Sequence, residues 1–173
     1  MMNNKIVGIT CSTFDLLHTG HIIMLEECKK HCDYLICALQ NDPTIDRKDK
    51  NKPIQSLVER YLQLDAVKYV DKIIPYNDEE ELEELFSSLD LDVRIIGEDY
   101  KDKNYTAKSI CQKRGIRIIY NKRDHNYSTT NLRKKIYDGE SKKRFINRRG
   151  VPFWTCGRCG YAKRKNSYSR NKS

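Results

Sequence analysis

The sequence lacks the long apolar segment that a membrane-spanning helix requires. In its 173 residues no apolar run approaches the roughly 20 residues that cross a bilayer. The opening MMNNKIVGIT also lacks the basic, apolar and small-residue succession of a secretory signal. We therefore expect a cytoplasmic protein without a membrane span. The length and a hydrophobic content of 38% suit one domain of ordinary size with an appendage.

The sequence also lacks the even cysteine framework of a disulfide-stabilised secreted protein. Its seven cysteines are an odd number scattered through apolar or helical segments, so most are interpreted as small buried hydrophobic residues. Cys156 and Cys159 differ, because a CxxC turn supplies half of a tetrahedral zinc site. The other ligands would come from Cys28, His31 or Cys32, or from a second subunit. The alternative is a free dithiol or redox pair.

Acidic residues are absent from the C-terminal segment. Residues 142–173 contain eleven Lys and Arg and no Asp or Glu, which leaves 22 basic against 24 acidic residues in the preceding 141. The net charge of +9 therefore belongs to the tail, and we divide the chain into a domain of residues 1–140 and a basic tail of residues 141–173. Aromatic residues among the tail's basic ones indicate a polyanion or nucleic-acid contact, with a disordered solubilising tail as the alternative.

Short apolar strands alternate with helices along the first 137 residues. The pattern predicts strands at residues 5–10, 33–39, 71–76, 93–97 and 116–120, and helices at 20–31, 56–70, 78–89, 106–114 and 129–137. Ser56 and Glu59 match a capping box. This alternation predicts an α/β fold, a Rossmann-like, doubly wound, five-stranded parallel sheet with helices on both faces. The loops at the carboxyl ends of its strands should converge on one ligand crevice.

Two histidines lie at the junction between the first predicted strand and the first predicted helix. His18 and His21 are separated by Thr-Gly, and free N–H groups at a helix start attract anions. Gly20 lets a ligand approach the backbone closely. The imidazoles can donate hydrogen bonds to charge that develops on a phosphorus and its bridging oxygen. The alternative, an ordinary pair of surface or core histidines, is disfavoured by the strand–FDLLHTGH–helix context.

A second hydroxyl-rich segment opens the last predicted helix. In RDHNYSTT, Arg123 precedes Ser128 and Thr129, and hydroxyls with free N–H groups at a helix start form a second anion site. A simple N-cap would explain Ser128 alone. The pairing of this segment with HTGH, at the opposite end of the domain, favours the anion site.

Four segments carry a family resemblance: STFDLLHTGH, VERYLQLDAVKYVDKIIPY, IIGEDY and YSTTNLRKKI. In order and spacing they resemble the HxGH nucleotidyltransferase superfamily, specifically its cytidylyltransferase-like branch, over about residues 5–137. The resemblance implies that a phosphate oxygen of an acceptor attacks the α-phosphorus of a nucleoside triphosphate in line and releases pyrophosphate. It also implies Mg²⁺ with the nucleotide, and a homodimer.

The resemblance further implies roles for individual residues. The implied catalytic residues are His18, His21, Lys52 and Arg123. The implied nucleotide-binding residues are Thr13, Phe14, Gly20, Asp99, Ser128 and Thr129, and the implied acceptor-binding residues are Arg60, His125 and Tyr127. Three of these assignments keep an alternative. Lys52 could belong to a solvated loop, and Lys48 or Lys50 could take its place at the phosphates. Arg60 could be an exposed helix arginine, and Asp99 a turn residue.

The sequence leaves the base and the acceptor open. Enzymes of this branch that act on glycerol 3-phosphate carry Thr-Glu-Gly where this chain has Asp-His-Asn at residues 124–126. STTN and GEDYK also resemble adenylyltransferases that activate heptose phosphates. We predict transfer of CMP from CTP to a phosphorylated small alcohol similar to glycerol 3-phosphate. The alternatives are an adenylyltransferase that uses ATP and a sugar phosphate, and a nucleic-acid-binding module on a nucleotidyltransferase scaffold.

Overall fold

The computed structural model describes residues 5–122 and 124–146 of the chain. The chain divides into two units, residues 1–133 and residues 134–173, and the last helix runs across that boundary. In chain order the elements are β1 (Val7–Ser12), α1 (Thr19–Lys29), β2 (Tyr34–Gln40), α2 (Leu57–Asp65), β3 (Lys72–Tyr76), α3 (Glu79–Ser88), β4 (Val93–Gly97), the 3₁₀ helix η1 (Glu98–Tyr100), α4 (Lys108–Arg114), β5 (Arg117–Asn121) and α5 (Thr129–Ile146).

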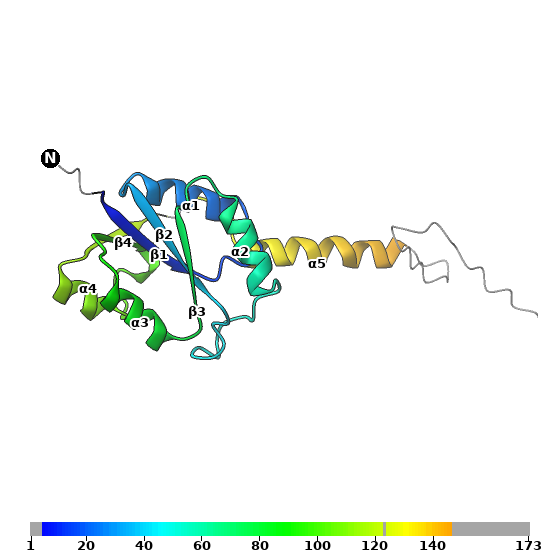
Figure 1. Cartoon of the computed structure of the whole chain (residues 1–173). Coiled ribbons are helices and arrows are strands. Elements are labelled where there is room, and N and C mark those ends of the chain that lie inside the picture. Colours follow the sequence, from blue (N-terminus) through cyan, green and yellow to red (C-terminus); the bar gives the residue numbers. More distant parts are fainter. Residues whose placement is uncertain (1–4, 123, 147–173) are drawn as a thin grey trace, which may run out of the picture. The chain divides into compact units, whose positions relative to one another are not determined.

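The five strands form one parallel sheet in the order β3-β2-β1-β4-β5. The winding reverses at β1, which pairs with β2 on one side and with β4 on the other. Helices α1 and α2 therefore cover one face of the sheet, and α3 and α4 cover the other (Figure 1). The predicted Rossmann-like α/β fold is confirmed, with its topological switch point at the carboxyl ends of β1 and β4.

Each face of the sheet packs against its own helices. Leu25 of α1 and Leu64 of α2 are fully buried in the cluster on one face, and Phe86 of α3 and Cys111 of α4 in the cluster on the other. Strand β2 is buried on both sides, which explains its uninterrupted apolar sequence. The interpretation of the domain's cysteines as core residues is confirmed. Four of them are buried free thiols and one is half-buried: Cys28, Cys32, Cys37 and Cys111, then Cys11.

Three local features differ from the sequence prediction. Helix α5 continues to Ile146, beyond the predicted end at Tyr137, and this extension contains Glu140 and residues 142–144, which are good helix formers, together with the unfavourable Gly139. Helix α2 ends at Asp65, and the short η1 was not predicted. The predicted tail from residue 147 onward, with Cys156 and Cys159, lies outside the described residues, as does Arg123. Within the described residues, no helix combines the length and apolar character of a membrane span.

Candidate active site

The backbone of the loop between β1 and α1 is strained, and hydrogen bonds to neighbouring side chains hold it in place. Phe14 and Leu16 have φ angles of 48° and 51°, in the left-handed region that side chains other than glycine rarely adopt. The Phe14 N–H donates to Ser12 Oγ (3.4 Å), and the Leu16 N–H donates to Gln55 Oε1 (2.7 Å). Strained backbone of this kind persists only where surrounding contacts determine it, and it concentrates at functional sites.

His18 and His21 cap α1 and stack on each other. His18 Nδ1 accepts a hydrogen bond from the Gly20 N–H (3.0 Å), and the His18 N–H donates to His21 Nδ1 (3.4 Å), a capping box built from two imidazoles. The ring centroids lie 4.0 Å apart. Because each Nδ1 accepts a hydrogen bond, the neutral ring carries its proton on Nε2. The capping geometry thus makes Nε2–H the side-chain donor of both histidines.

The start of α5 meets the histidine pair. Thr129 Oγ1 lies 3.4 Å from His18 Nε2, although the two residues are 111 positions apart, and it donates to the Asp15 carbonyl (3.3 Å). Ser128 caps α5, because its Oγ accepts from the Asn131 N–H (3.1 Å). The structure therefore brings together the two anion sites that the sequence predicted at opposite ends of the domain. Two helix starts, two imidazoles and a threonine hydroxyl surround one position.

Gly20 permits the close approach of two imidazoles. A Cβ atom at this position would lie 2.9 Å from His18 Cε1 and 2.9 Å from His125 Cε1, closer than such atoms pack. His125, predicted as an acceptor contact, thus lies directly over the first turn of α1. Its Nδ1 is buried without a hydrogen-bond partner in the structure. Tyr127, the neighbouring prediction, is 53% exposed, with its ring 5.6 Å from that of His125.

Replacement of Gly20 by alanine is expected to displace both imidazoles and to slow the predicted nucleotidyl transfer. The new methyl group must push the rings of His18 and His125 apart, because the α1 backbone cannot retreat without losing its cap. We expect kcat/KM to fall by about tenfold or more, with the melting temperature changed by only a few degrees, since alanine favours a helix over glycine. Steady-state kinetics and thermal unfolding measure the two effects. A variant with unaltered kinetics would contradict the placement of these rings.

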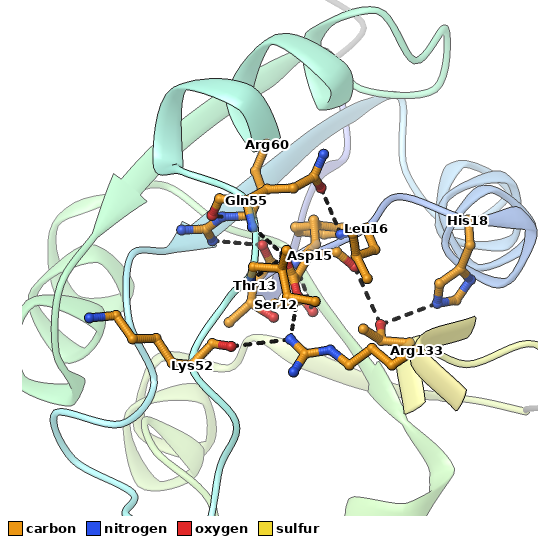
Figure 2. Close-up of polar contacts among 12 residues, drawn as sticks. Ser12, Thr13, Asp15, Leu16, His18, Lys52, Gln55, Arg60 and Arg133 are labelled. Atoms are coloured by element: carbon orange, nitrogen blue, oxygen red, sulfur yellow. Dashed lines mark hydrogen bonds and ion pairs between the residues drawn. The ribbon is translucent and has the colours of Figure 1, made fainter. Parts of the chain in front are cut away.

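A buried carboxylate, Asp15, ties three segments of the site together. Its Oδ1 accepts from the backbone N–H groups of Ile54 and Gln55 (both 3.0 Å), and its Oδ2 binds Arg133 Nη2 at 2.6 Å (Figure 2). Burial raises the pKa of Asp15, but the hydrogen bonds from Gln55, Arg133 and Ile54 together lower it below its ordinary value. Asp15 is therefore a charged anchor that joins the β1–α1 loop, the loop before α2, and α5.

Arg133 also contacts the loop that carries Lys52, the lysine that the sequence analysis placed at the phosphates. Its Nη2 also donates to the carbonyl of Lys52 (3.1 Å), so α5 holds the backbone of the loop on which Lys52 stands (Figure 2). The Lys52 side chain is 80% exposed, and its Nζ lies 3.7 Å from Asp42 Oδ2. The sequence analysis missed Asp15 and Arg133. Asp15 could have been found from its place next to Phe14 in the loop after the first predicted strand. No pattern in the sequence around Arg133 indicates its role.

Arg60, predicted as an acceptor contact, is a buried structural residue. It is 2% exposed, and its guanidinium donates to the carbonyls of Thr13 (2.8 Å), Gln40 (2.6 Å), Asn41 (2.7 Å) and Gln55 (3.2 Å). Burial lowers its pKa. Neither the predicted substrate contact nor the alternative of an exposed helix arginine describes this residue. Arg60 fixes the chain segments that follow β1 and β2 and precede α2, which makes it a positioning residue.

The remaining predicted residues occupy different positions around the site. Phe14 is fully buried, with its ring 5.6 Å from that of His21, so only its backbone can face a ligand. Thr13 is half-buried, and Asp99 is exposed in η1 after β4. Within residues 5–122 and 124–146, no cluster of three or more His, Cys, Asp or Glu side chains forms a metal site. Cys28 and Cys32 lie in the core, and burial raises the pKa of the Cys28 thiol to about 12.

The chain is similar to known proteins over almost the whole of the described domain. It matches the Cytidylyltransferase-like family over residues 9–135. It is 34% identical to the glycerol-3-phosphate cytidylyltransferase of Staphylococcus aureus, over 78% of this chain and 97% of that protein, and 35% identical to that of Bacillus subtilis, over 74% and 95%. It is also 34% identical to the bifunctional protein HldE of Campylobacter jejuni, over 79% of this chain and 29% of that protein.

Solved structures agree with this relationship. A lipopolysaccharide core biosynthesis protein from Thermoplasma volcanium is 28% identical, with a TM-score of 0.55 over 72% of this chain and 99% of that one. The pantothenate synthetase of Thermus thermophilus, 15% identical with a TM-score of 0.52 over 83% of this chain and 70% of that one, shares the fold. Sequence motifs, parallel sheet and family match lead to one conclusion: the chain belongs to the cytidylyltransferase-like family of nucleotidyltransferases.

Proposed function

We propose that the protein transfers CMP from CTP to a phosphorylated small alcohol, with release of pyrophosphate. The observation that carries this proposal is the contact of Thr129 Oγ1 with His18 Nε2, which gathers both predicted phosphate-binding segments around one position. The relatives from S. aureus and B. subtilis, named for glycerol 3-phosphate, support CTP and a polyol phosphate as substrates. The resemblance of STTN and GEDYK to adenylyltransferases that activate heptose phosphates supports the alternative, ATP with a sugar phosphate.

The reaction needs positioned donors and no protein nucleophile. The triphosphate lies at the starts of α1 and α5, where helix N–H groups and the Nε2–H donors of His18 and His21 face its oxygens. A phosphate oxygen of the acceptor forms a bond to the α-phosphorus while the bond from that phosphorus to the α,β-bridging oxygen breaks. The electron pair of that bond leaves with pyrophosphate. Both histidines stabilise the added negative charge on the α-phosphate oxygens in the transition state.

Magnesium is expected to arrive with the nucleotide. Mg²⁺ in proteins commonly binds substrate phosphates, several waters and one or two carboxylates at most. The donor set of the described residues fits this mode, because it holds no three-ligand cluster that would form a protein cage. When bound, the ion neutralises charge on the phosphate oxygens. The residues proposed here to bind and orient the phosphates are His18, His21, Ser128, Thr129 and, outside the described residues, Arg123.

His125 is proposed as a substrate contact whose partner is a phosphate oxygen. Replacement of His125 by alanine is expected to lower kcat/KM by about tenfold or more, because the ring contacts the helix start where the phosphates bind. The melting temperature should not fall, since the buried Nδ1 has no hydrogen-bond partner to lose. The matched control is His31→Ala, two residues beyond the end of α1, which should leave kinetics unchanged. A large loss of stability with normal kinetics in His125→Ala would contradict this role.

Pyrophosphate release with a panel of substrates tests the proposal. CTP, ATP, GTP and UTP are each combined with glycerol 3-phosphate, phosphocholine, phosphoethanolamine and heptose 1-phosphate. The proposal predicts release with CTP and a polyol phosphate. Release with ATP alone would favour the adenylyltransferase. Absence of pyrophosphate release with every combination would favour a nucleic-acid-binding module. Binding assays with RNA and DNA would then test that function.

We also propose that the protein is a homodimer. Helix α2 and the residues before it carry exposed apolar side chains, among them Ile54 (62%), Val58 (66%) and Leu62 (63%). Val58 and Leu62 are one helical turn apart, so they share a face that a second copy of the chain could cover. Light scattering on the purified protein, which gives the molar mass in solution, distinguishes a dimer from a monomer.

The basic tail is proposed to contact a polyanion, and Cys156 and Cys159 to bind zinc. The zinc proposal rests on CxxC spacing. Burial of Cys28 and Cys32 in the core argues against those residues as the missing ligands, which leaves His31 and a second subunit as the predicted sources. Metal analysis of the wild-type protein and of Cys156→Ser tests it, and a wild-type protein without zinc would end this proposal.

A further inference from the structure

Three lysines lie in the loop between β2 and α2, and the structure distinguishes them. The sequence analysis placed Lys52 at the phosphates, with Lys48 or Lys50 as substitutes. Lys50 Nζ lies 4.0 Å from the carboxylate of its neighbour Asp49. The Lys52 carbonyl instead accepts a hydrogen bond from Arg133 of α5, 81 positions further along the chain (3.1 Å). As far as the structure describes the contacts of these three lysines, Lys52 is the one that another element of the fold holds.

Arg133 depends on the first turn of α5 for its own position. Thr129 and Arg133 are four residues apart, so their side chains share one face of the helix. Both bind Asp15: Thr129 Oγ1 donates to its carbonyl (3.3 Å), and Arg133 Nη2 donates to its carboxylate (2.6 Å). The same Nη2 reaches the Lys52 carbonyl (Figure 2). The backbone of Lys52 is therefore linked to the helix start that, through Thr129, also contacts His18.

The side chain of Lys52 is held less firmly than its backbone. Figure 2 shows it extended away from His18 and Arg133. Its Nζ lies 3.7 Å from Asp42 Oδ2, and the side chain is 80% exposed. The other oxygen of Asp42 accepts from the N–H and the Oγ1 of Thr44 (2.9 and 2.7 Å), which fixes the carboxylate. Because an ion pair of an exposed lysine adds little stability, an anion of higher charge can replace Asp42 as its partner.

We propose that Arg133 is a positioning residue for Lys52. It holds the Lys52 backbone beside the start of α5, so that the Lys52 ammonium turns from Asp42 to the terminal phosphates of a nucleotide bound at Thr129. The inference rests on the proposed function. A guanidinium suits this role, because it is always charged and its rigid fork holds a fixed geometry. Arg133 acts through Lys52 and needs no contact with the substrate, because its Nη2 already binds Asp15 and the Lys52 carbonyl.

The test is a double-mutant cycle on nucleotide binding. Calorimetry with CTP and Mg²⁺, without acceptor, gives the dissociation constants of the wild type, Lys52→Ala, Arg133→Met and the double variant. Each single change is expected to weaken binding by about tenfold, the scale of one charge-assisted hydrogen bond. The double variant should also bind about tenfold more weakly than the wild type, because Arg133 then has no lysine to position. Independent contributions would multiply to about a hundredfold.

Two controls and a second substitution accompany this cycle. Lys134→Met removes the same charge from the next, exposed residue of α5 and should change the dissociation constant by less than about twofold. Lys50→Ala should likewise change it by less than about twofold. Arg133→Met leaves the buried Asp15 without its charged partner, which can unfold the protein. Arg133→Lys keeps that charge on a shorter side chain with one nitrogen. It should weaken CTP binding about threefold, with no further loss when Lys52→Ala is added.

The outcomes separate this inference from the proposed function. A hundredfold loss in the double variant, or wild-type binding in either single variant, would overturn the positioning role of Arg133 while the triphosphate site stands. The cycle requires no turnover, so it tests Arg133 even if no acceptor supports transfer. Binding of ATP but not of CTP would contradict the proposed base, and the same cycle with ATP would still test Arg133. A wild-type protein that binds neither nucleotide nor inorganic tripolyphosphate would contradict both the proposed function and this inference.

Discussion

Replacement of His18 by alanine is expected to lower kcat by at least about a hundredfold, the scale of one preorganised donor to a developing oxyanion. His21→Ala should have an effect of the same size, because both rings are held in the same tautomer by the capping box. Pyrophosphate release at saturating CTP and acceptor measures the change. A near-normal rate in either variant would remove that histidine from the mechanism.

His18 also caps α1, so the catalytic and structural effects must be separated. Loss of an N-cap side chain costs about 1 kcal/mol of stability, which by itself does not reduce kcat a hundredfold. The matched variant is His18→Asn, because asparagine is a good N-cap but lacks the Nε2–H of the imidazole. It should restore the melting temperature of the wild type without restoring the rate. Recovery of both properties would show that His18 acts only as a cap.

Replacement of Asp15 by alanine is expected to be the most destabilising change in the site. It removes the acceptor of two backbone N–H groups and the partner of Arg133. Loss of one partner of a buried charge pair costs about 3 kcal/mol or more, and kcat should fall as well because the loop that carries His18 loses its anchor. Chemical unfolding and steady-state kinetics measure the two effects. A variant with wild-type stability would show that Asp15 does not hold the loop.

The dependence of this stabilisation on pH follows from the lowered pKa of Asp15. A carboxyl whose folded pKa lies below its unfolded value of about 3.9 stabilises the fold fully above the unfolded value and loses that contribution as the pH falls through the folded pKa. The difference in unfolding free energy between the wild type and Asp15→Asn should therefore be constant from about pH 5 to 8 and shrink below about pH 4. A difference that grows toward low pH would contradict the charged state assigned to Asp15.

Patterns within short segments were sufficient to predict the fold and the meeting of the two anion sites. The central strand β2 is buried on both faces, and the alternation of apolar strands with helices predicts a doubly wound parallel sheet. His18 and Thr129 were predicted to converge because each begins a helix after a strand of the same parallel sheet, whose carboxyl ends share one edge. These predictions depend on local sequence and on a general rule of topology.

The residues that hold the site depend on contacts that no local pattern contains. Asp15 and Arg133 are 118 positions apart, and their pairing requires the complete sheet. Arg60 was assigned to the acceptor because its position in VERY resembles that of a family arginine. In the structure its buried guanidinium donates hydrogen bonds to four backbone carbonyls from three segments of the chain.

A crystal structure of the protein with bound CTP tests the central claim most directly. The claim is that the histidine pair and the start of α5 bind one triphosphate. The account predicts phosphate oxygens within hydrogen-bond distance of His18 Nε2, His21 Nε2 and Thr129 Oγ1 in a single nucleotide. A triphosphate bound elsewhere on the domain, with these three groups contacting only protein or water, would contradict it.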